Sequence, residues 1–386
     1  MKSRILFTLS GLLGLMGSVL ISGCSSSEGV AESESTLVGA YYYAWYSRPR
    51  SEQDLGRWNQ SIRVRLQHRQ LPAAGLYSSE DPEVIRTHIR QSIQAGIDFW
   101  AVSWWGPDKD QTFRESILNH PDHQKLKYAV LYESTGRLGT FAQPDYSRWI
   151  SDFEHLRQHY FDQPSYLKIN NRPVVFVYLT REYFRNRGEA ALRMLRERFP
   201  EVYLVGDDIF FIDGQGEYQS RWAANFDAIT AYDVYGQSIK PLGGTREAVA
   251  TLSRNYAQAR QAAHSVETGF IPAIAPGYND LPTRPEKRHP GRARYFTDVE
   301  GSREGDVFRA MIAEAALPHL DPKADNMLMI TSFNEWLEDS QIESTSGTEP
   351  PSNRDDSVSG TALTQGETYF DYGDLYLDIL REMVPR

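Results

Sequence analysis

The stretch MLMITSFNEWLE, residues 327 to 338, places two glutamates directly after a run of apolar residues. Four consecutive apolar residues followed by Thr-Ser-Phe are typical of a buried strand. Glu335 and Glu338 come where that strand would end. Acidic side chains at the carboxyl end of a buried parallel strand face the substrate side of barrel enzymes. We therefore expect a strand over residues 327–333 whose end carries carboxylates that do chemistry.

Seven similar runs precede this stretch, with helical segments between them. They span residues 38–46, 97–105, 127–133, 173–179, 202–208, 226–232 and 270–275. One intervening helix is expected to begin at Asp81-Pro82, and residues 369–384 form a final amphipathic segment. Strands that alternate with helices indicate βα units and a parallel sheet. Eight such units over about 350 residues predict an α/β fold, a (β/α)8 TIM barrel that forms a single catalytic domain.

The carboxyl ends of these runs carry aromatic and acidic side chains that a barrel would bring to one face. The expected set is Trp45, Tyr46, Trp104, Trp105, Glu133, Tyr178, Asp207, Asp208, Tyr232, Tyr278, Asn279, Asn334, Glu335, Trp336 and Glu338. The longest irregular stretches, residues 48–79, 137–146, 278–302 and 344–367, also follow strand ends. Aromatic rings stack on sugars, and carboxylates act as acids and bases. We expect an aromatic, acidic mouth with little positive charge that binds a carbohydrate.

The first 36 residues are predicted to lie outside this fold. Residues 1–23 have a short basic region and an apolar stretch that is too short to span a membrane as a mature helix, as in a signal peptide. Ile21-Ser-Gly-Cys24 resembles the lipobox of bacterial lipoproteins, which implies cleavage before Cys24 and its acylation. An ordinary secretory signal with an incidental cysteine is the alternative. Residues 24–36 then form a lipidated cysteine with a flexible tether, and residues 37–386 form the catalytic domain.

Cys24 is the only cysteine among 386 residues. An exported chain with one thiol cannot form an internal disulfide, which favours the lipid anchor. Ser25 follows directly, and the lack of Asp there resembles a sorting signal for the outer membrane. We therefore expect a protein that is lipid-anchored in a bacterial membrane and faces the periplasm or the cell surface.

Composition and motifs argue against other partners and chemistries. The net charge of −10 disfavours nucleic acid as a partner, because phosphate binding needs a basic surface. The sequence has no His-Glu-x-x-His pair, cysteine cluster or P-loop. Asp207-Asp208 could contribute to a metal site, but no third oxygen ligand is near in sequence, and a structural role is favoured. We expect no metal and no cofactor.

The same residues resemble glycoside hydrolase family 99, the endo-α-mannosidases and endo-α-mannanases. Thr331-Ser-Phe-Asn-Glu-Trp336, with Glu338 and Gln341-Ile-Glu343, looks like the signature of that family. The resemblance recurs at Tyr42-Tyr43, Trp45-Tyr46, Trp58-Asn59, residues 75–85, Ser103-Trp104, Tyr132-Glu133, Phe226-Asp227, residues 276–278 and Tyr376-Leu377. It therefore spans nearly all of residues 38–383, in order.

This resemblance implies a retaining, endo-acting glycoside hydrolase that cleaves a 1,2-trans-linked glycan such as an α-mannan. It implies that Glu338 is the general acid/base. Glu335 would be the base that assists the substrate's own 2-hydroxyl, and the reaction would pass through a 1,2-anhydro sugar. Glu338 must start protonated, so its pKa should be raised by burial and by its acidic neighbour. The resemblance makes Glu133 a substrate-binding carboxylate and Tyr232 an active-site tyrosine.

The chain departs from the family pattern near the expected sugar site. Leu337 stands where the family usually has His, which removes a polar contact, and Glu286-Lys287 stands where the family has Trp-Asn. The loops after the sixth and seventh strands are shorter. Two alternatives follow: the same acid pair acts on another polysaccharide, or the chain is a surface glycan-binding lipoprotein without turnover. Asp339 is expected to be solvated or to act as a cap, and Glu343 to brace the loop.

Overall fold

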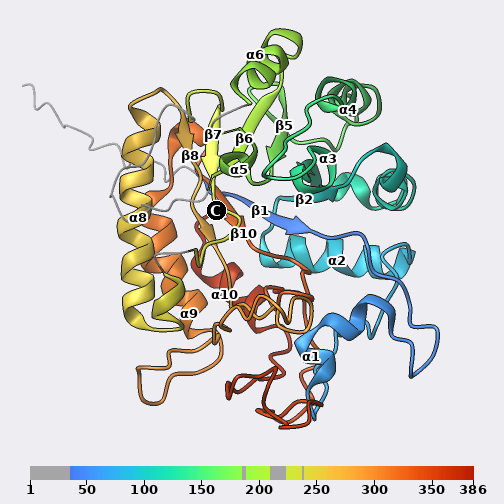
Figure 1. Ribbon diagram of the computed structural model, residues 1–386, viewed down its shortest axis with the longest axis vertical. Coiled ribbons are helices and arrows are strands. Elements are labelled where there is room, and N and C mark those ends of the chain that lie inside the picture. The colour runs from blue at the N-terminus through green and yellow to red at the C-terminus, as the bar shows by residue number, and fades with distance from the viewer. Residues whose placement is uncertain (1–34, 185–187, 209–222, 237–238) are drawn as a thin grey trace, which may run out of the picture. The chain divides into compact units, whose positions relative to one another are not determined.

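A computed structural model describes residues 35–184, 188–208, 223–236 and 239–386 (Figure 1). These residues belong to one compact unit, Glu34–Arg386. The predicted signal peptide, Cys24 and the tether as far as residue 34 lie outside the described residues. Over the described ranges, no helix combines the length and the apolar character needed to cross a bilayer.

Parallel strands follow one another around one sheet. They are β1 (Leu37–Tyr42), β2 (Phe99–Trp104), β3 (Lys127–Tyr132), β5 (Arg172–Val177), β6 (Tyr203–Asp207), β7 (Ala228–Thr230), β8 (Gly269–Phe270), β9 (Ala273–Ile274) and β10 (Met327–Ile330). Their hydrogen-bonded order is β8-β7-β6-β5-β3-β2-β1-β10-β9, and the short β4 (Lys168–Ile169) pairs with β5 in antiparallel fashion. Each predicted run contains a strand. The strands are shorter than predicted because the final residues of most runs bend into the loops.

The seventh predicted run is split into β8 and β9 at Ile271-Pro272. Proline has no N–H to donate, so regular pairing is interrupted there. The ladder continues nevertheless: Ile271 N–H donates to the carbonyl of Ile229, and the carbonyl of Pro272 accepts from Met329 N–H. Because β8 pairs with β7 and β9 pairs with β10, one run joins both ends of the strand order. The predicted (β/α)8 barrel is confirmed.

Helices follow most strands and cover the sheet (Figure 1). They are α1 (Ile62–Arg65), α2 (Pro82–Ala95), α3 (Ser134–Arg137), α4 (Trp149–Leu156), α5 (Thr180–Phe184), α6 (Glu189–Arg198), α8 (Arg246–His264), α9 (Asp306–Ala310) and α10 (Leu375–Met383). Short 3₁₀ and π segments are η1 (Gly56–Gln60), η2 (Pro107–Lys109), η3 (Thr112–Ile117), η4 (His123–Lys125), η5 (Arg157–Phe161), η6 (Lys240–Leu242), η7 (Met311–Ala316), η8 (Leu317–His319) and η9 (Pro322–Ala324).

Local capping explains why α2 begins where the sequence predicts. The carboxylate of Asp81 accepts the N–H of Glu83, and Pro82 occupies the first helical position, where no N–H is needed. The last helix, α10, begins six residues later than predicted, at Leu375 rather than Tyr369. Tyr369 instead pairs with Ser352 in an isolated antiparallel bridge, which keeps the backbone extended there.

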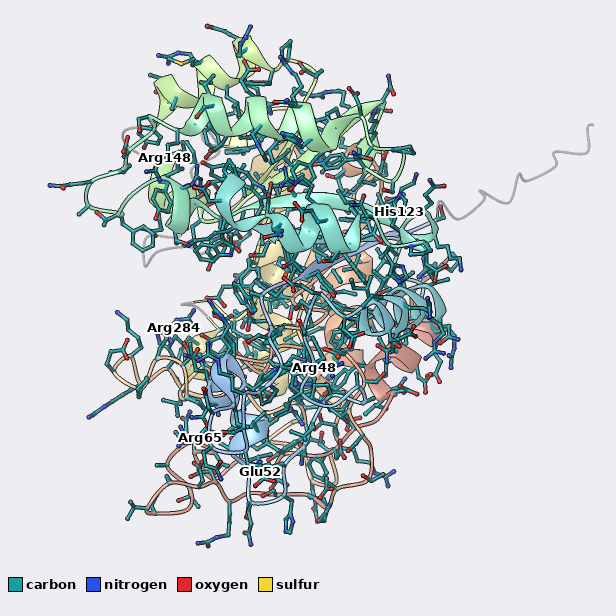
Figure 2. All side chains as sticks on the ribbon, turned by 90° about the vertical axis from the view of Figure 1, so that its right-hand side faces the viewer. Arg48, Glu52, Arg65, His123, Arg148 and Arg284 are labelled. Atoms are coloured by element: carbon teal, nitrogen blue, oxygen red, sulfur yellow. The ribbon has the colours of Figure 1, made fainter. Side chains whose placement is uncertain are left out.

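The loop after β1 and the loop after β10 are tied together beyond the carboxyl ends of the two strands. Leu66 pairs with Asp355, and Pro72 pairs with Thr345, each in an antiparallel bridge. Arg65, in the lower part of Figure 2, binds Asp356 across the same junction. Residues almost 300 positions apart therefore support one another around the end of β10.

Candidate active site

Glu335 lies just after β10 and is held by short hydrogen bonds within its own loop. Its N–H donates to Ser332 Oγ at 2.7 Å, and its Oε1 accepts the N–H of Leu337 at 2.9 Å. The side chain is buried. Burial is the main cause that raises the pKa of Glu335 well above its ordinary value, and the charge of Glu338 adds to it. Burial and the neighbouring charge therefore favour the protonated form of Glu335.

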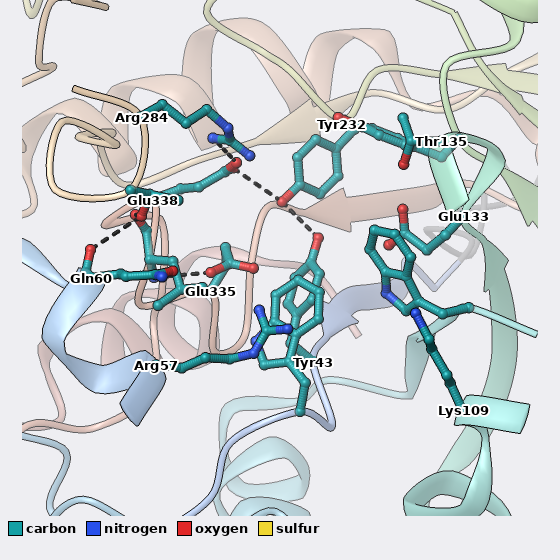
Figure 3. A pocket seen from close by; sticks show the side chains of 15 residues that line it. Tyr43, Arg57, Gln60, Lys109, Glu133, Thr135, Tyr232, Arg284, Glu335 and Glu338 are labelled. Carbon is teal, nitrogen blue, oxygen red and sulfur yellow. Dashed lines mark hydrogen bonds and ion pairs between the residues drawn. The ribbon is translucent and has the colours of Figure 1, made fainter. Parts of the chain in front are cut away.

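Glu338 faces the same pocket from three residues further on (Figure 3). Arg284 Nη1 lies 2.7 Å from its Oε1, and the hydroxyl of Tyr232 donates to its Oε2 at 3.4 Å. Burial raises the pKa of Glu338, as predicted, while the charge and hydrogen bond of Arg284 oppose that rise. The nearby carboxylates of Asp280 and Asp233 add to it. Glu338 thus sits between groups that favour its proton and a guanidinium that favours its ionised form.

Two adjoining cavities meet at Glu338. The first, of about 410 Å³, is lined by both glutamates, and the second measures about 360 Å³. Glu338, Arg284, Tyr178 and Tyr232 line both cavities. Each volume is in the range of small-ligand sites. An elongated ligand could therefore extend from one cavity to the other past Glu338.

Most of the predicted site residues meet in these cavities. Those that line at least one of them are Trp45, Trp105, Glu133, Tyr178, Tyr232, Tyr278, Glu335 and Glu338. They come from seven different strand ends, which is the convergence expected of a barrel.

Trp104 and Trp336 do not line either cavity, contrary to prediction. Side chains alternate along a strand, so Trp105 faces the mouth while Trp104 points outward, where its Nε1–H donates to Asp110. Trp336 is fully buried, and its Nε1–H donates to Glu343 at 2.7 Å. Both rings are buried in the protein interior, and they pack behind the residues that line the cavities.

Tyr46 and Asn334 also lie one layer beneath the cavities rather than on their walls. The hydroxyl of Tyr46 donates to the carbonyl of Asn334 at 2.9 Å and accepts the N–H of Trp336 at 3.0 Å. The side-chain amide of Asn334 bonds both the N–H and the carbonyl of Tyr43. These contacts join β1 to the loop after β10 and so position Glu335.

Several residues of the pocket were not predicted. Tyr43 lines it, and its hydroxyl donates to that of Tyr232 at 2.7 Å. Side chains alternate along the first predicted strand, so Tyr43 shares a face with Trp45. This pattern predicts that Tyr43 lines the pocket. Arg57, Lys109 and Arg284 also line the first cavity, so the prediction of little positive charge is wrong. Arg57 and Lys109 lie on the short segments η1 and η2 and Arg284 lies on a loop, where the sequence gives no direction for a side chain.

Glu133 closes β3 and is buried, with the hydroxyl of Ser103 donating to it at 2.6 Å. Burial raises the pKa of Glu133 to about 8; the Ser103 bond opposes the rise, while Glu338 and Asp207 add to it. This folded-state pKa is above the unfolded value of about 4.3. The contribution of Glu133 to stability is therefore full below pH ~4.3 and is lost as the pH rises through about 8.

Glu133→Gln should consequently stabilise the protein at high pH. We expect its melting temperature to exceed that of wild type by at least about 2 °C at pH 9, with a smaller difference at pH 5. Thermal melts at both pH values measure this. The exposed Glu286→Gln serves as the control and should behave alike at both pH values. An equal effect of Glu133→Gln at pH 5 and pH 9 would contradict the assignment.

Asp207 binds backbone N–H groups at the ends of neighbouring strands. Its carboxylate accepts the N–H groups of Leu179 and Tyr232 at 3.0 and 2.6 Å. Burial raises its pKa to about 7, which these two bonds oppose. The bonds give Asp207 a structural role. Over the part of the chain that the structure describes, no cluster of His, Cys, Asp and Glu could hold a metal ion.

The sequence suggests that Asp339 is solvated, but its side chain is almost fully buried. Its backbone has a φ of 50°, a conformation that Asp tolerates better than most residues. Its carboxylate accepts from Arg63 Nε at 2.5 Å and from Arg294 Nη2 at 3.2 Å. Burial opposes ionisation of Asp339, but the two arginines outweigh it and hold its pKa below the ordinary value. This ion pair anchors the turn that carries Glu338.

Glu343 braces the same loop from its other end, as expected. It accepts hydrogen bonds from the hydroxyl of Tyr77 at 2.8 Å and from the indole of Trp336 at 2.7 Å. His88 Nε2 lies 2.9 Å from its other oxygen. The four acids of residues 335–343 thus divide into two that face the cavity and two that hold the loop.

Comparison with known proteins identifies the family. Residues 34–355 match the pattern of Glycosyl hydrolase family 99. The chain is 24% identical over 346 residues to glycoprotein endo-alpha-1,2-mannosidase of Mus musculus, covering 80% of this chain and 67% of the mouse protein. It is 24% identical over 334 residues to the glycoprotein endo-alpha-1,2-mannosidase-like protein of Homo sapiens, covering 79% and 67%.

A solved structure has the same fold. The GH99 endo-alpha-mannosidase from Bacteroides thetaiotaomicron superposes with a TM-score of 0.63 at 21% identity, over 90% of this chain and 97% of that one. The family match begins just before β1 and extends beyond the loop that carries Glu335 and Glu338. The chain therefore belongs to glycosyl hydrolase family 99 and is a glycoside hydrolase.

Proposed function

We propose that this glycoside hydrolase is endo-acting and retaining, and that it cleaves a 1,2-trans-linked, α-mannan-like glycan. The observation that carries the proposal is the pair of buried glutamates on one cavity wall, with Glu338 at the junction of two cavities. Relatives described as endo-alpha-mannosidases support the substrate class. Space on both sides of the acid supports internal cleavage of a chain rather than removal of an end sugar.

Two glutamates suffice for retention if the substrate supplies the nucleophile. Glu338 donates its proton to the glycosidic oxygen as the bond to C1 breaks. Glu335 takes the proton of the 2-hydroxyl while O2 attacks C1 from the opposite side, which gives a 1,2-anhydro sugar. Water then opens this ring at C1 as Glu338 removes its proton and Glu335 returns one to O2. Two inversions give net retention, and no protein nucleophile is needed.

This chemistry selects the configuration of the substrate. O2 can attack C1 from behind only if it lies trans to the leaving group, as in an α-mannoside. In an α-glucoside the same hydroxyl is cis and cannot react. The mechanism therefore predicts the stereochemical class of the substrate.

A panel of polysaccharides with product analysis tests the proposal. The purified protein should release oligosaccharides rather than single sugars from an α-mannan, and nuclear magnetic resonance should show the retained anomer first. Linear α-glucans serve as the matched cis control and should be left intact. If neither wild type nor Glu338→Gln cleaves any glycan while both bind sugars equally, the chain is a glycan-binding protein instead.

Arg284 should set the pH range of the reaction. It bonds Glu338 at 2.7 Å and opposes the rise in the pKa of that carboxyl. Because the acid must be protonated, Arg284→Gln should move the basic limb of the kcat/KM profile to higher pH. Arg284→Lys, which keeps the charge, should move it less. Identical limbs in wild type and Arg284→Gln would show that Glu338 does not control this limb.

We also propose that Cys24 anchors the protein to a bacterial membrane through lipid, with the outer membrane as the expected site. The lipobox-like residues 21–24 and the single cysteine support this proposal. Cys24→Ser should move the protein from the membrane fraction to the soluble fraction. Ser25→Ala, which keeps the thiol, serves as the control. Continued membrane attachment of Cys24→Ser would exclude a lipid at this residue.

A further inference from the structure

Three cations surround the two cavities without a carboxylate partner in the described ranges. Arg57 on η1 and Lys109 on η2 line the first cavity, and Lys287 lines the second. All three are exposed. Among the described residues, none of the three side chains forms an ion pair or a hydrogen bond. The protein as a whole is acidic, with a net charge of −10, so their gathering at one site is notable.

The acids of the pocket have partners of their own. Glu338 bonds Arg284 at 2.7 Å, Glu133 accepts from Ser103 at 2.6 Å, and Glu335 accepts the N–H of Leu337 at 2.9 Å. The exposed cations are therefore not needed to satisfy these carboxylates. Their positive charges are available to a ligand.

Two of the cations lie against aromatic rings that can hold a sugar. The guanidinium carbon of Arg57 is 4.9 Å from the ring centre of Trp45, and Lys109 Nζ is 6.0 Å from that of Trp105. The two indole rings are themselves neighbours, with centroids 6.1 Å apart. Figure 3 shows Arg57 and Lys109 reaching the pocket from separate segments. A sugar stacked on these rings would have cations within reach of its substituents.

The apolar side chain of Leu337 gives a neutral sugar no advantage over a charged one. Leu337 lines the first cavity with an apolar side chain that offers a sugar hydroxyl no hydrogen bond. Arginine and lysine instead form their strongest hydrogen bonds with sulfate, phosphate and carboxylate groups. Lys287 extends the positive charge to the second cavity, beyond Glu338.

We infer that the enzyme prefers a glycan whose sugars carry anionic substituents, such as sulfate, phosphate or carboxylate groups, on both sides of the cleaved linkage. The inference rests on the proposed function, which supplies the glycan backbone. Arg57 and Lys109 bind substituents in the first cavity, and Lys287 binds one in the second. The glutamates act on the linkage and take no part in this selection.

Matched substrates test the inference. Wild type is assayed on a neutral α-mannan and on the same chain bearing sulfate esters, phosphodiesters or carboxylates, in separate arms. We expect kcat/KM for the best anionic chain to exceed that for the neutral chain by about tenfold at low salt. The ratio should fall towards one at high salt, because exposed charges are screened. The arms show which anionic group is preferred.

A triple variant, Arg57→Gln/Lys109→Gln/Lys287→Gln, should bring that ratio close to one. The control triple, Arg50→Gln/Lys125→Gln/Lys168→Gln, removes equal charge from surface positions away from both cavities and should keep the wild-type ratio. Equal kcat/KM for neutral and anionic chains in wild type would overturn the inference and leave the proposed function standing. An equal loss of preference in the control triple would have the same consequence.

A binding measurement separates the two proposals if no chain is cleaved. Calorimetry with Glu338→Gln then compares the neutral oligosaccharide with its sulfated form. Tighter binding of the sulfated form, abolished by adding the triple substitution, supports the anion site while the proposed activity fails. Equal binding of the two forms overturns the inference.

Discussion

Glu338→Gln should lower the rate of glycan hydrolysis by roughly 10²–10⁴-fold, the usual contribution of a positioned general acid. The amide has nearly the same shape as the acid but cannot donate a proton to the leaving oxygen. Arg284 loses a charged partner, yet Asp280 still binds it at 2.9 Å. The variant should therefore stay folded, and its kcat should fall while sugar binding survives.

The measurement compares initial rates, sugar affinity and melting temperature for wild type and Glu338→Gln. Glu286→Gln is the control, because Glu286 is an exposed acid on the same loop as Arg284 and does not line either cavity. A substrate whose leaving group needs no proton, such as an activated aryl glycoside, should recover part of the lost rate. Retention of more than a tenth of the activity on a natural glycan would remove Glu338 from the role of acid.

Asp339→Ala should destabilise the protein by about 3–5 kcal/mol, because it leaves buried charge without a partner. Arg63 and Arg294 are both buried and both bond this carboxylate. Glu304 is the other acid near them, 3.9 Å from Arg63. Removing Asp339 leaves one carboxylate beside two guanidinium groups. The turn behind Glu338 loses its anchor as well, so activity should fall even in molecules that remain folded.

Urea unfolding followed by fluorescence measures this loss. Asp356→Ala is the matched control: Asp356 also binds an arginine, Arg65, but at the surface, where such pairs contribute about 0–1 kcal/mol. Asp339→Asn keeps the shape and one acceptor, and provides a milder variant if Asp339→Ala does not fold. The folded pKa of Asp339 is lowered, so its stabilisation exists above the unfolded pKa and is lost as the pH falls through the folded one. Equal losses from Asp339→Ala and Asp356→Ala would contradict this account.

Patterns within short segments were enough to predict the barrel and to bring Glu335 and Glu338 to one cavity. The apolar run 327–330 became β10, and the acids just beyond it reached the mouth because parallel strand ends share one face. The start of α2 followed from Asp81 and Pro82, whose effect is local. The alternation of side chains along a strand also separates Trp105, which lines the cavity, from Trp104, which does not. The same alternation places Tyr43 on the cavity side.

Contacts between distant segments decided the rest. Asp339 is one residue from Glu338, yet its role depends on Arg63 and Arg294, which lie 276 and 45 positions away. The cations of the pocket come from loops and short 3₁₀ segments, in which no periodicity gives a side chain its direction. Neighbours along the chain determine whether a segment forms a strand or a helix. Burial and charge pairing depend on which segments meet, so only the assembled barrel separates the acids that face the cavity from those that hold it.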